Sequence, residues 1–447
     1  MKKRKRDWTI LLYSVADELP LRKAANHTLL DIDRASTNLA VKTVAQLTLH
    51  ANDSHPVRRY DFEEKASPER RVDVENKLQY VACAVRTPLK ELTDFLRWGQ
   101  REYPAKRYGV ILQGHAWGAD YSIPALNLVR AAKQKTEHTV CRLIFGSPRS
   151  KNHLNNKQLQ NALARASANG KFDLLGIDAC LMSMTEISYE LHQCADFTVA
   201  QEGLDPIAGW PLYPILTGLN RQPSTGAEGL GSIVLAKFSA KYRHWGGDMK
   251  ITQALCSLRF SDALMRAVKE LVSCLRLGLK NPPVRSAIVH ARLACAHFRM
   301  ANYVDFCHFC QLLTHEPAIP PDSSLSKAAA RVEAILREKF IVEVTLKRGR
   351  ADSFGLSIFF PKWQIGARPR ASKWQALPLH DPFEIPRTFA RAVLKINAAY
   401  ADDEFAGQSG WKEFLLEFIQ ARSVKHHKNS KQEAGSPARL KKKTRKR

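Results

Sequence analysis

The chain has 447 residues and a mass of 50.4 kDa, with 45% hydrophobic and 9% aromatic residues, a composition that excludes a wholly disordered protein. Lysine and arginine number 69 against 43 acidic residues, so the net charge is +26. Much of this excess lies at the two ends, residues 2–6 and 422–447. Such ends can bind polyanions nonspecifically and in a salt-dependent way. They lack interleaved aromatic residues for base stacking, so a solvated tail that aids solubility is the alternative interpretation.

Membrane and secretion signals are weak in this sequence. No stretch approaches the ~18–20 consecutive apolar residues that span a bilayer. The basic start followed by the apolar run 8–16 resembles a signal peptide, but Thr9 and Ser14 interrupt the run and no small-residue cleavage site precedes Asp17. We interpret this run as the first core strand. Nine cysteines, an odd number scattered along the chain, form no disulfide framework, so we expect a cytoplasmic location rather than secretion.

The first half of the chain alternates strand and helix patterns. We expect strands at 8–15, 41–49, 57–63, 108–112, 172–177 and 197–200, and helices at 29–39, 88–99, 155–168 and 184–194. Either Asn155 or Asn156 can cap the third of these helices. Continuous apolar runs such as WTILLYSV at 8–15 indicate strands buried on both faces. The alternation predicts an α/β fold with a mostly parallel sheet covered by helices.

The pattern changes to α+β beyond about residue 245. Helices are expected at 261–277, 325–336 and 386–400, and strands at 340–346 and 355–360. The chain is therefore divided into a basic N-terminal segment at 1–7, an α/β domain at 8–245, an α+β C-terminal subdomain at 246–421 and a disordered basic tail at 422–447.

Two strand ends carry residues suited to nucleophilic chemistry. The strand at 108–112 leads into QGHAWG, which contains His115, and the strand at 172–177 leads into Asp178 and Cys180. Functional groups gather at the carboxyl ends of parallel strands, so neighbouring strands would bring His115 and Cys180 together. An imidazole and a helix N-terminus shift a thiol toward thiolate, and the imidazole returns a proton to the leaving amine. Taken singly, Cys180 is better explained as a buried thiol and His115 as a hydrogen-bonded loop histidine. The two together at neighbouring strand ends indicate a thiol hydrolase.

The segment GIDACLMSMTEISYELHQCADFTVAQEGLDPIAGWPL at 176–212 resembles the nucleophile segment of the clostripain family of cysteine peptidases, which have a caspase-like fold. Its features are D-A-C-L-M, E-x-x-x-E-L, A-D-x-x-V-A-x-E and G-W-P. Residues 8–17, 106–117 and 355–361 resemble the first strand, the histidine segment and a late strand of that family. The resemblance implies a caspase-like peptidase domain at 8–245, extended by the C-terminal subdomain, and a cysteine endopeptidase activity.

The resemblance also implies roles for individual residues. Cys180 would be the nucleophile and His115 the general acid/base, with the backbone N–H groups of Ala116 and Cys180 forming the oxyanion hole. Asp178 would bind a basic P1 side chain, so cleavage after Arg or Lys is implied. Ala116 stands where the family commonly has glycine. Ala208 stands where some members have an acidic residue.

The sequence also bears on self-cleavage, cofactors and alternative functions. Family members are often cut between their histidine and cysteine segments, and the long basic interval between His115 and Cys180 suits self-cleavage. Protein or peptide substrates are implied and no cofactor; some members use calcium, but no D-x-[DN]-x-[DN]-G loop is present. A zinc site could be suggested from Cys295, His297, Cys307, His308 and Cys310. Helical spacing around Cys310 favours packing instead. The alternative function is an inactive caspase-like protein that binds peptides, or nucleic acid and anionic surfaces through its basic ends.

Overall fold

The computed structural model describes residues 5–35, 40–49, 52–62, 78–116, 118–119, 154–167, 170–244, 251–297, 302–347, 353–361, 400 and 403–421. Three predicted features therefore lie outside the described residues: the basic interval at 120–153, the helix at 386–400 apart from Tyr400, and the tail at 422–447. Within the described part of the chain, no helix is both long and apolar enough to cross a bilayer.

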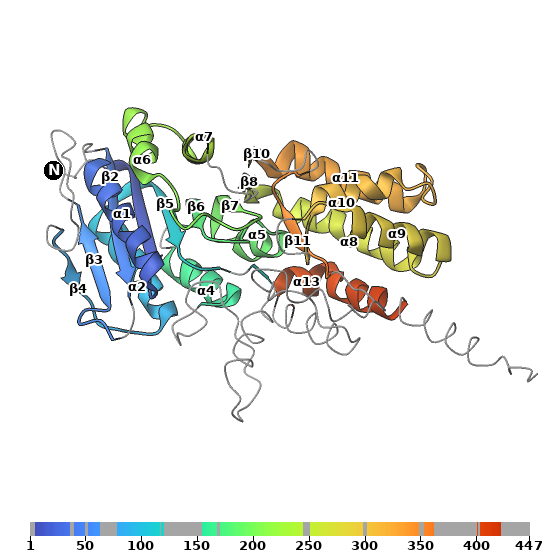
Figure 1. Cartoon of the computed structure of the whole chain (residues 1–447), viewed down its shortest axis with the longest axis horizontal. Helices are drawn as coiled ribbons and strands as arrows, with labels where there is room; N and C mark the ends of the chain where they lie inside the picture. The colour runs from blue at the N-terminus through green and yellow to red at the C-terminus, as the bar shows by residue number, and fades with distance from the viewer. Residues whose placement is uncertain are drawn as a thin grey trace, which may run out of the picture.

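A nine-stranded sheet forms the centre of the molecule (Figure 1). Its order is β10-β8-β7-β6-β5-β1-β2-β3-β4. The strands are β1 (Arg6–Val15), β2 (Val41–Thr48), β3 (Val57–Asp61), β4 (Val81–Ala82), β5 (Ala105–Gln113), β6 (Phe172–Asp178), β7 (Ala195–Gln201), β8 (Ile251–Ser257) and β10 (Ile341–Lys347). The five strands from β7 to β2 are parallel, and antiparallel strands continue the sheet at both ends. The predicted mostly parallel sheet is confirmed.

Helices cover both faces of this sheet. They are α1 (Leu19–Ala35), α2 (Pro88–Glu102), α4 (Asn156–Ala166), α5 (Thr185–Leu191), α6 (Leu212–Arg221) and α7 (Ala227–Tyr242). Side chains alternate along β1, so Trp8, Ile10 and Leu12 pack under α1, α6 and α7, whereas Leu11 and Tyr13 pack under α2. Two apolar layers are the reason that β1 is apolar without interruption.

The C-terminal part packs on the α2 side of the sheet and also contributes strands to it. It contains α8 (Ser261–Gly278), α9 (Pro282–Ala294), α10 (Phe306–His315), α11 (Ser324–Ile335), α13 (Glu404–Ser409), a helix at 411–421, and a small sheet of β9 (Tyr303–Asp305) and β11 (Ser357–Phe359). Because β8 and β10 belong to the nine-stranded sheet, the two parts share one structural unit. The division at residue 245 stays a prediction.

Local boundaries differ from the sequence-based ranges where polar residues lie in buried elements. Helix α1 begins at Leu19, ten residues before the expected start, because the polar stretch 20–28 weakens the apolar periodicity. Helix α4 begins as expected: the Asn155 side chain accepts a hydrogen bond from the Gln158 N–H at 2.7 Å, and the Asn155 N–H donates to Gln158 Oε1 at 2.9 Å. This reciprocal pair assigns the cap to Asn155 rather than Asn156.

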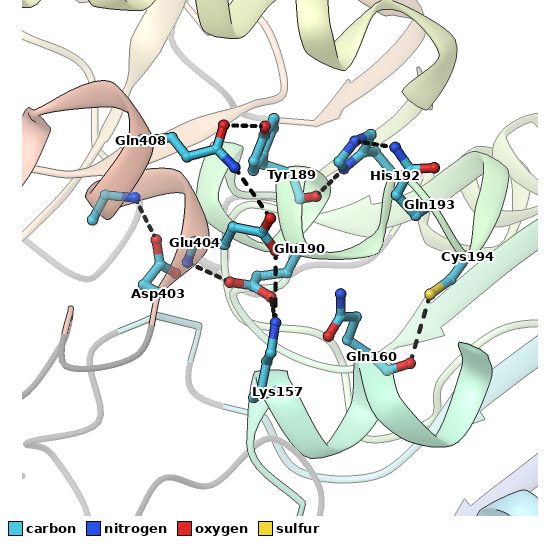
Figure 2. Close-up of polar contacts among 11 residues, drawn as sticks. Lys157, Gln160, Tyr189, Glu190, His192, Gln193, Cys194, Asp403, Glu404 and Gln408 are labelled. Atoms are coloured by element: carbon cyan, nitrogen blue, oxygen red, sulfur yellow. Dashed lines mark hydrogen bonds and ion pairs between the residues drawn. The ribbon is translucent and has the colours of Figure 1, made fainter. Parts of the chain in front are cut away.

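Helix α5, which follows the Cys180 segment, is held between α4 and α13 by polar contacts (Figure 2). The N–H of Glu404 donates to Glu190 Oε1 at 2.6 Å. Lys157 Nζ lies 3.7 Å from Glu190 Oε2 and 3.6 Å from Glu404 Oε2. The Tyr189 hydroxyl donates to Gln408 at 2.9 Å. Two segments distant in sequence, α4 and α13, therefore fix the helix that follows the Cys180 segment.

Candidate active site

The register between two central strands brings the two predicted catalytic residues to one place. Strands β5 and β6 are parallel neighbours in which Gln113 is paired with Asp178. His115 and Cys180 each follow this pair by two residues, at the carboxyl ends of their strands. Both line one cavity of about 100 Å³, together with Asp178, Asp205 and Gly209. The structure thus gathers the residues that the sequence singled out.

The nucleophile candidate lies on a strained turn. Cys180 is partly buried, and the next residue, Leu181, has φ +62°, the one positive φ among the described non-glycine residues. This conformation costs about 1–2 kcal/mol for an L side chain and is maintained by surrounding contacts. The Leu181 N–H donates to the Gly203 carbonyl at 2.8 Å, and the Asp205 N–H donates to Cys180 Sγ at 3.2 Å. The turn therefore fixes the sulfur beside a backbone donor.

The thiol is protonated in this state of the protein. Burial, together with the nearby Asp205 and Asp178, raises the pKa of Cys180 to about 12. The expected help from a helix N-terminus is weak because α5 begins only at Thr185. Formation of the thiolate consequently requires a proton acceptor and a decrease of the surrounding negative charge.

His115 is about one-third exposed, with Nε2 3.7 Å from Glu18 Oε2. Glu18 directly precedes α1, and its position beside His115 follows from the adjacency of β1 and β5. Sequence reasoning missed Glu18, since no local pattern marks it. Ala116 is 2% exposed and, like all described non-glycine residues except Leu181, has a negative φ. An alanine therefore fits this position without backbone strain.

Asp178 is buried and already hydrogen-bonded. Its Oδ2 accepts from Gln113 Nε2 at 2.9 Å and from the Trp210 N–H at 3.1 Å. Gly209, at φ +55°, packs so closely that a Cβ there would lie 2.6 Å from this oxygen. Burial raises the pKa of Asp178. Asp178 therefore anchors the segment containing Trp210 as well as lining the cavity.

Asp205 also lines the cavity, and Lys241 lies near it without lining it. Both carboxyl oxygens of Asp205 are buried and accept no hydrogen bond from an N–H or hydroxyl donor of the described residues; the Asp178 carboxyl group beside them can bond to Asp205 when one of the two is protonated. Burial and the nearby Asp178 raise the pKa of Asp205 well above its usual range. Lys241 Nζ donates to the carbonyls of Ala208 and Gly209 at 2.7 and 2.9 Å, and burial lowers its pKa. No local pattern marks Lys241, which approaches the site from α7.

The candidate zinc residues are packed in the C-terminal part. Cys307 and Cys310 are buried in α10, as their helical spacing predicted. His308 Nδ1 accepts a hydrogen bond from the Ala296 N–H at 2.9 Å, and Cys295 Sγ donates to the Asp305 carbonyl at 3.2 Å. The described residues contain no group of three or more His, Cys, Asp or Glu side chains arranged to hold a metal ion.

Sequence comparison identifies the class of enzyme to which this fold and site correspond. The sequence model of the clostripain family, peptidase family C11, matches residues 73–317, which is more than half of the chain. The chain belongs to the clostripain family. It is a cysteine peptidase, a class of hydrolase that acts on protein or peptide substrates without a cofactor. A search of curated protein sequences found no match.

Solved structures with the same fold are C11 proteases. An inactive zymogen from Parabacteroides distasonis aligns with a TM-score of 0.59 and 15% identity over 92% of this chain and 99% of that chain. A secreted protease from Bacteroides thetaiotaomicron, in complex with an irreversible peptide inhibitor, gives a TM-score of 0.57 and 14% identity over 91% and 99%. Another secreted protease from that organism, iotapain, gives 0.58 and 15% over 80% and 94%. The caspase-like fold is thereby confirmed.

The predicted cytoplasmic location is wrong by this comparison. Two of the proteases with the same fold are secreted enzymes. The prediction rested on an odd number of cysteines and on the absence of a disulfide framework. Unpaired thiols are compatible with an extracellular protein when they are buried, and five of the eight described cysteines are buried.

Proposed function

We propose that this peptidase cleaves peptide bonds with a Cys180–His115 dyad and prefers Arg or Lys at P1. The observation that carries the proposal is the single cavity lined by His115, Cys180 and two carboxyl groups at adjacent strand ends. A nucleophile, a base and a cation-binding wall are the parts that such a reaction needs.

The proposed reaction begins when His115 takes the proton of the Cys180 thiol. The sulfur attacks the scissile carbonyl carbon, and the resulting oxyanion is stabilised by the backbone N–H groups of Cys180 and Ala116. His115 then donates the proton to the leaving amine, and water hydrolyses the thioester to release the acid and restore the thiol. Glu18, 3.7 Å from His115 Nε2, stabilises the imidazolium formed in the first step.

The carboxyl groups beside the sulfur support the proposed P1 preference. Asp205 is buried with no donor among the described residues other than a protonated Asp178, so a guanidinium or ammonium group entering the cavity would satisfy both carboxyl groups. Asp178 and Asp205 also raise the pKa of Cys180. A P1 cation that neutralises them would lower this pKa, so a basic substrate would help to generate its own thiolate.

An activity-based probe tests the dyad. A peptidyl ketone that alkylates thiols and carries Arg at P1 should label the wild type. Cys180→Ala should abolish labelling, and His115→Ala should slow it by about 10²-fold or more because the proton acceptor is lost. Cys274→Ala, which removes a partly exposed thiol from α8, is the matched control and should label normally. Normal labelling of His115→Ala would refute the dyad.

The P1 preference is measured with fluorogenic peptides that differ only at P1. We expect Arg and Lys substrates to be cleaved well and Leu or Glu substrates poorly. Asp205→Asn should lower kcat/KM for Arg substrates by about tenfold or more, since a charge-assisted bond is lost. Equal cleavage of Arg and Leu substrates would contradict the preference while leaving the dyad untouched.

Self-processing between His115 and Cys180 is part of the proposal. The wild type should separate into two fragments on a denaturing gel, whereas Cys180→Ala should remain whole. A fully active, uncut wild type would show that processing is unnecessary. Polyanion binding by the basic ends is tested separately: deletion of 422–447 should weaken binding to nucleic acid, and unchanged affinity would exclude that role.

A further inference from the structure

A second cavity lies apart from the one that contains Cys180. It has a volume of about 440 Å³ and is bounded by β2, β3, the residues after β4, and α2. Four arginines line it: Arg59, Arg86, Arg97 and Arg101. Two carboxyl groups, Glu91 and Asp94, line it as well. Positive charge therefore exceeds negative charge on its wall. The hydrogen bonds and ion pairs of these arginines and carboxyl groups determine where an anion could bind.

Both carboxyl groups already have donors. Asp94 Oδ2 lies 2.5 Å from Arg86 Nη1, which neutralises this arginine. Glu91 Oε1 accepts from the Arg86 N–H at 2.9 Å, and Oε2 accepts from the Thr48 hydroxyl at 3.4 Å. Burial also raises the pKa of Glu91, which favours its neutral form. The two acids therefore offset little of the charge of the remaining arginines.

Arg59 is the arginine most firmly fixed in the cavity wall. Its Nε donates to Gln46 Oε1 at 2.8 Å, and its Cζ lies 5.1 Å from the Trp98 ring centroid and 5.9 Å from that of Phe95. Among the described residues, no carboxylate forms an ion pair with this guanidinium. Burial lowers the pKa of Arg59; Cys83 and Asp94 oppose this effect, and Arg86 and Arg101 add to it. A bound negative charge would relieve this unfavourable environment.

The side-chain amide of Gln46 independently indicates that a hydrogen-bond acceptor could bind in this cavity. Its side chain is 1% exposed and lines the cavity. Its Oε1 is used by Arg59, while its Nε2 is buried without a hydrogen-bond partner among the described residues. Buried donors without an acceptor are rare and destabilising. An oxygen atom bound beside Arg59 would satisfy this amide as well.

We propose that this cavity binds an oxoanion, the phosphate or carboxylate group of a small molecule. Arg59 and the Gln46 amide donate to its oxygens, and Arg97 contributes positive potential at the entrance. Arg101 contributes less, because its Nε lies 2.8 Å from Glu102 Oε1. Arg97 is available for this because its Nε and Nη2 contact only a neutral group in the described structure, the Arg165 carbonyl, at 3.1 and 2.8 Å. A planar guanidinium held by an aromatic ring matches the two oxygens of such a ligand.

Cys83 provides a local reporter, since its partly exposed thiol lines the same cavity. Its alkylation by iodoacetamide is followed by peptide mass spectrometry, with increasing inorganic phosphate in one arm and citrate in the other. A local readout is needed because the basic ends also attract anions. Ionic strength is held constant with sodium chloride. The variants are Arg59→Gln and Arg97→Gln, with Lys90→Gln as the control that removes a charge from α2 outside the cavity.

We expect saturable protection of Cys83 by phosphate, citrate or both in the wild type and in Lys90→Gln. Protection by one anion alone identifies the ligand group. Arg59→Gln should raise the concentration for half-protection about tenfold or more, and Arg97→Gln about three-fold or more. Arg97 is exposed, so this variant keeps the test decisive if Arg59→Gln fails to fold. Absence of protection by both anions in the wild type, or equal protection in the wild type and Arg97→Gln, would overturn the proposal.

Discussion

Glu186, a buried residue of the helix that follows Cys180, should make the stability of this protein depend on pH. Glu186 lies in α5 and is fully buried; its Oε1 accepts from the Phe359 N–H at 2.8 Å and the Tyr400 hydroxyl at 2.7 Å. Its Oε2 has no hydrogen-bond partner in the described part of the chain. Burial raises the pKa of Glu186 from its usual 4.5 to about 7. The folded state therefore favours the protonated carboxyl group.

The size and sign of the effect follow from this shift. The stabilising contribution of the protonated group is fully present below about pH 4.5 and is lost as the pH rises through about 7. The difference corresponds to about 3 kcal/mol. Glu186→Gln keeps an acceptor for Phe359 and Tyr400 but cannot ionise. Relative to the wild type, the glutamine variant should become more stable by most of this amount between about pH 5 and about pH 8.

Urea unfolding followed by tryptophan fluorescence measures this prediction. The wild type, Glu186→Gln and the exposed-site control Glu413→Gln are compared at both pH values. Buried acids without an electrostatic contribution from Glu186, such as Asp305, titrate equally in all three proteins and cancel in the comparison. Burial and the Glu186 carboxylate raise the pKa of Asp403, so the Glu186→Gln difference includes the response of Asp403. The control should follow the wild type. If the stability difference between Glu186→Gln and the wild type were the same at both pH values, within about 0.5 kcal/mol, the reasoning would be refuted.

Three further substitutions test the fold and the site. Asn155→Ala removes the cap of α4 and should lower the free energy of unfolding by about 1 kcal/mol in urea; no change would contradict the capping role. Gly209→Ala places a Cβ against Asp178 Oδ2 at a positive φ, so kcat/KM should decrease about tenfold or more. Trp411→Ala empties a fully buried aromatic site and should cost about 3–5 kcal/mol in the same unfolding assay, whereas a loss below about 1 kcal/mol would exclude it from the core.

The central strands and the catalytic candidates were predictable because their signals are local. The apolar runs at β1, β5 and β6 identify buried strands, and His115 and Cys180 directly follow two of them. Strand β8 escaped prediction because Thr252 and Gln253, both fully buried, interrupt its apolar pattern. These polar side chains lie inside the sheet layers, where sequence periodicity expects apolar residues.

Contacts between distant segments could not be predicted from a single sequence. Glu18 and His115 are far apart in the chain and meet because β1 and β5 are neighbours. Lys241 reaches the site from α7, and Arg59 contacts Trp98 only because β3 and α2 share one face of the sheet. In each case the decisive information is strand order. Helix and strand propensities do not predict the order of strands in a sheet.

The polar contacts between α5 and α13 join parts of the chain that are synthesised at different times. Glu190 and Tyr189 meet their partners Glu404 and Gln408 more than two hundred residues later in the chain. During synthesis from the N-terminus, the helix that follows Cys180 therefore lacks these contacts until residues 404–408 have emerged. A nascent or truncated product that lacks residues 404–421 would leave the Glu190 carboxylate without its Glu404 donor and the Tyr189 ring without its contact to Phe405. Stable packing of α5 is therefore expected only after residues 404–421 have been synthesised.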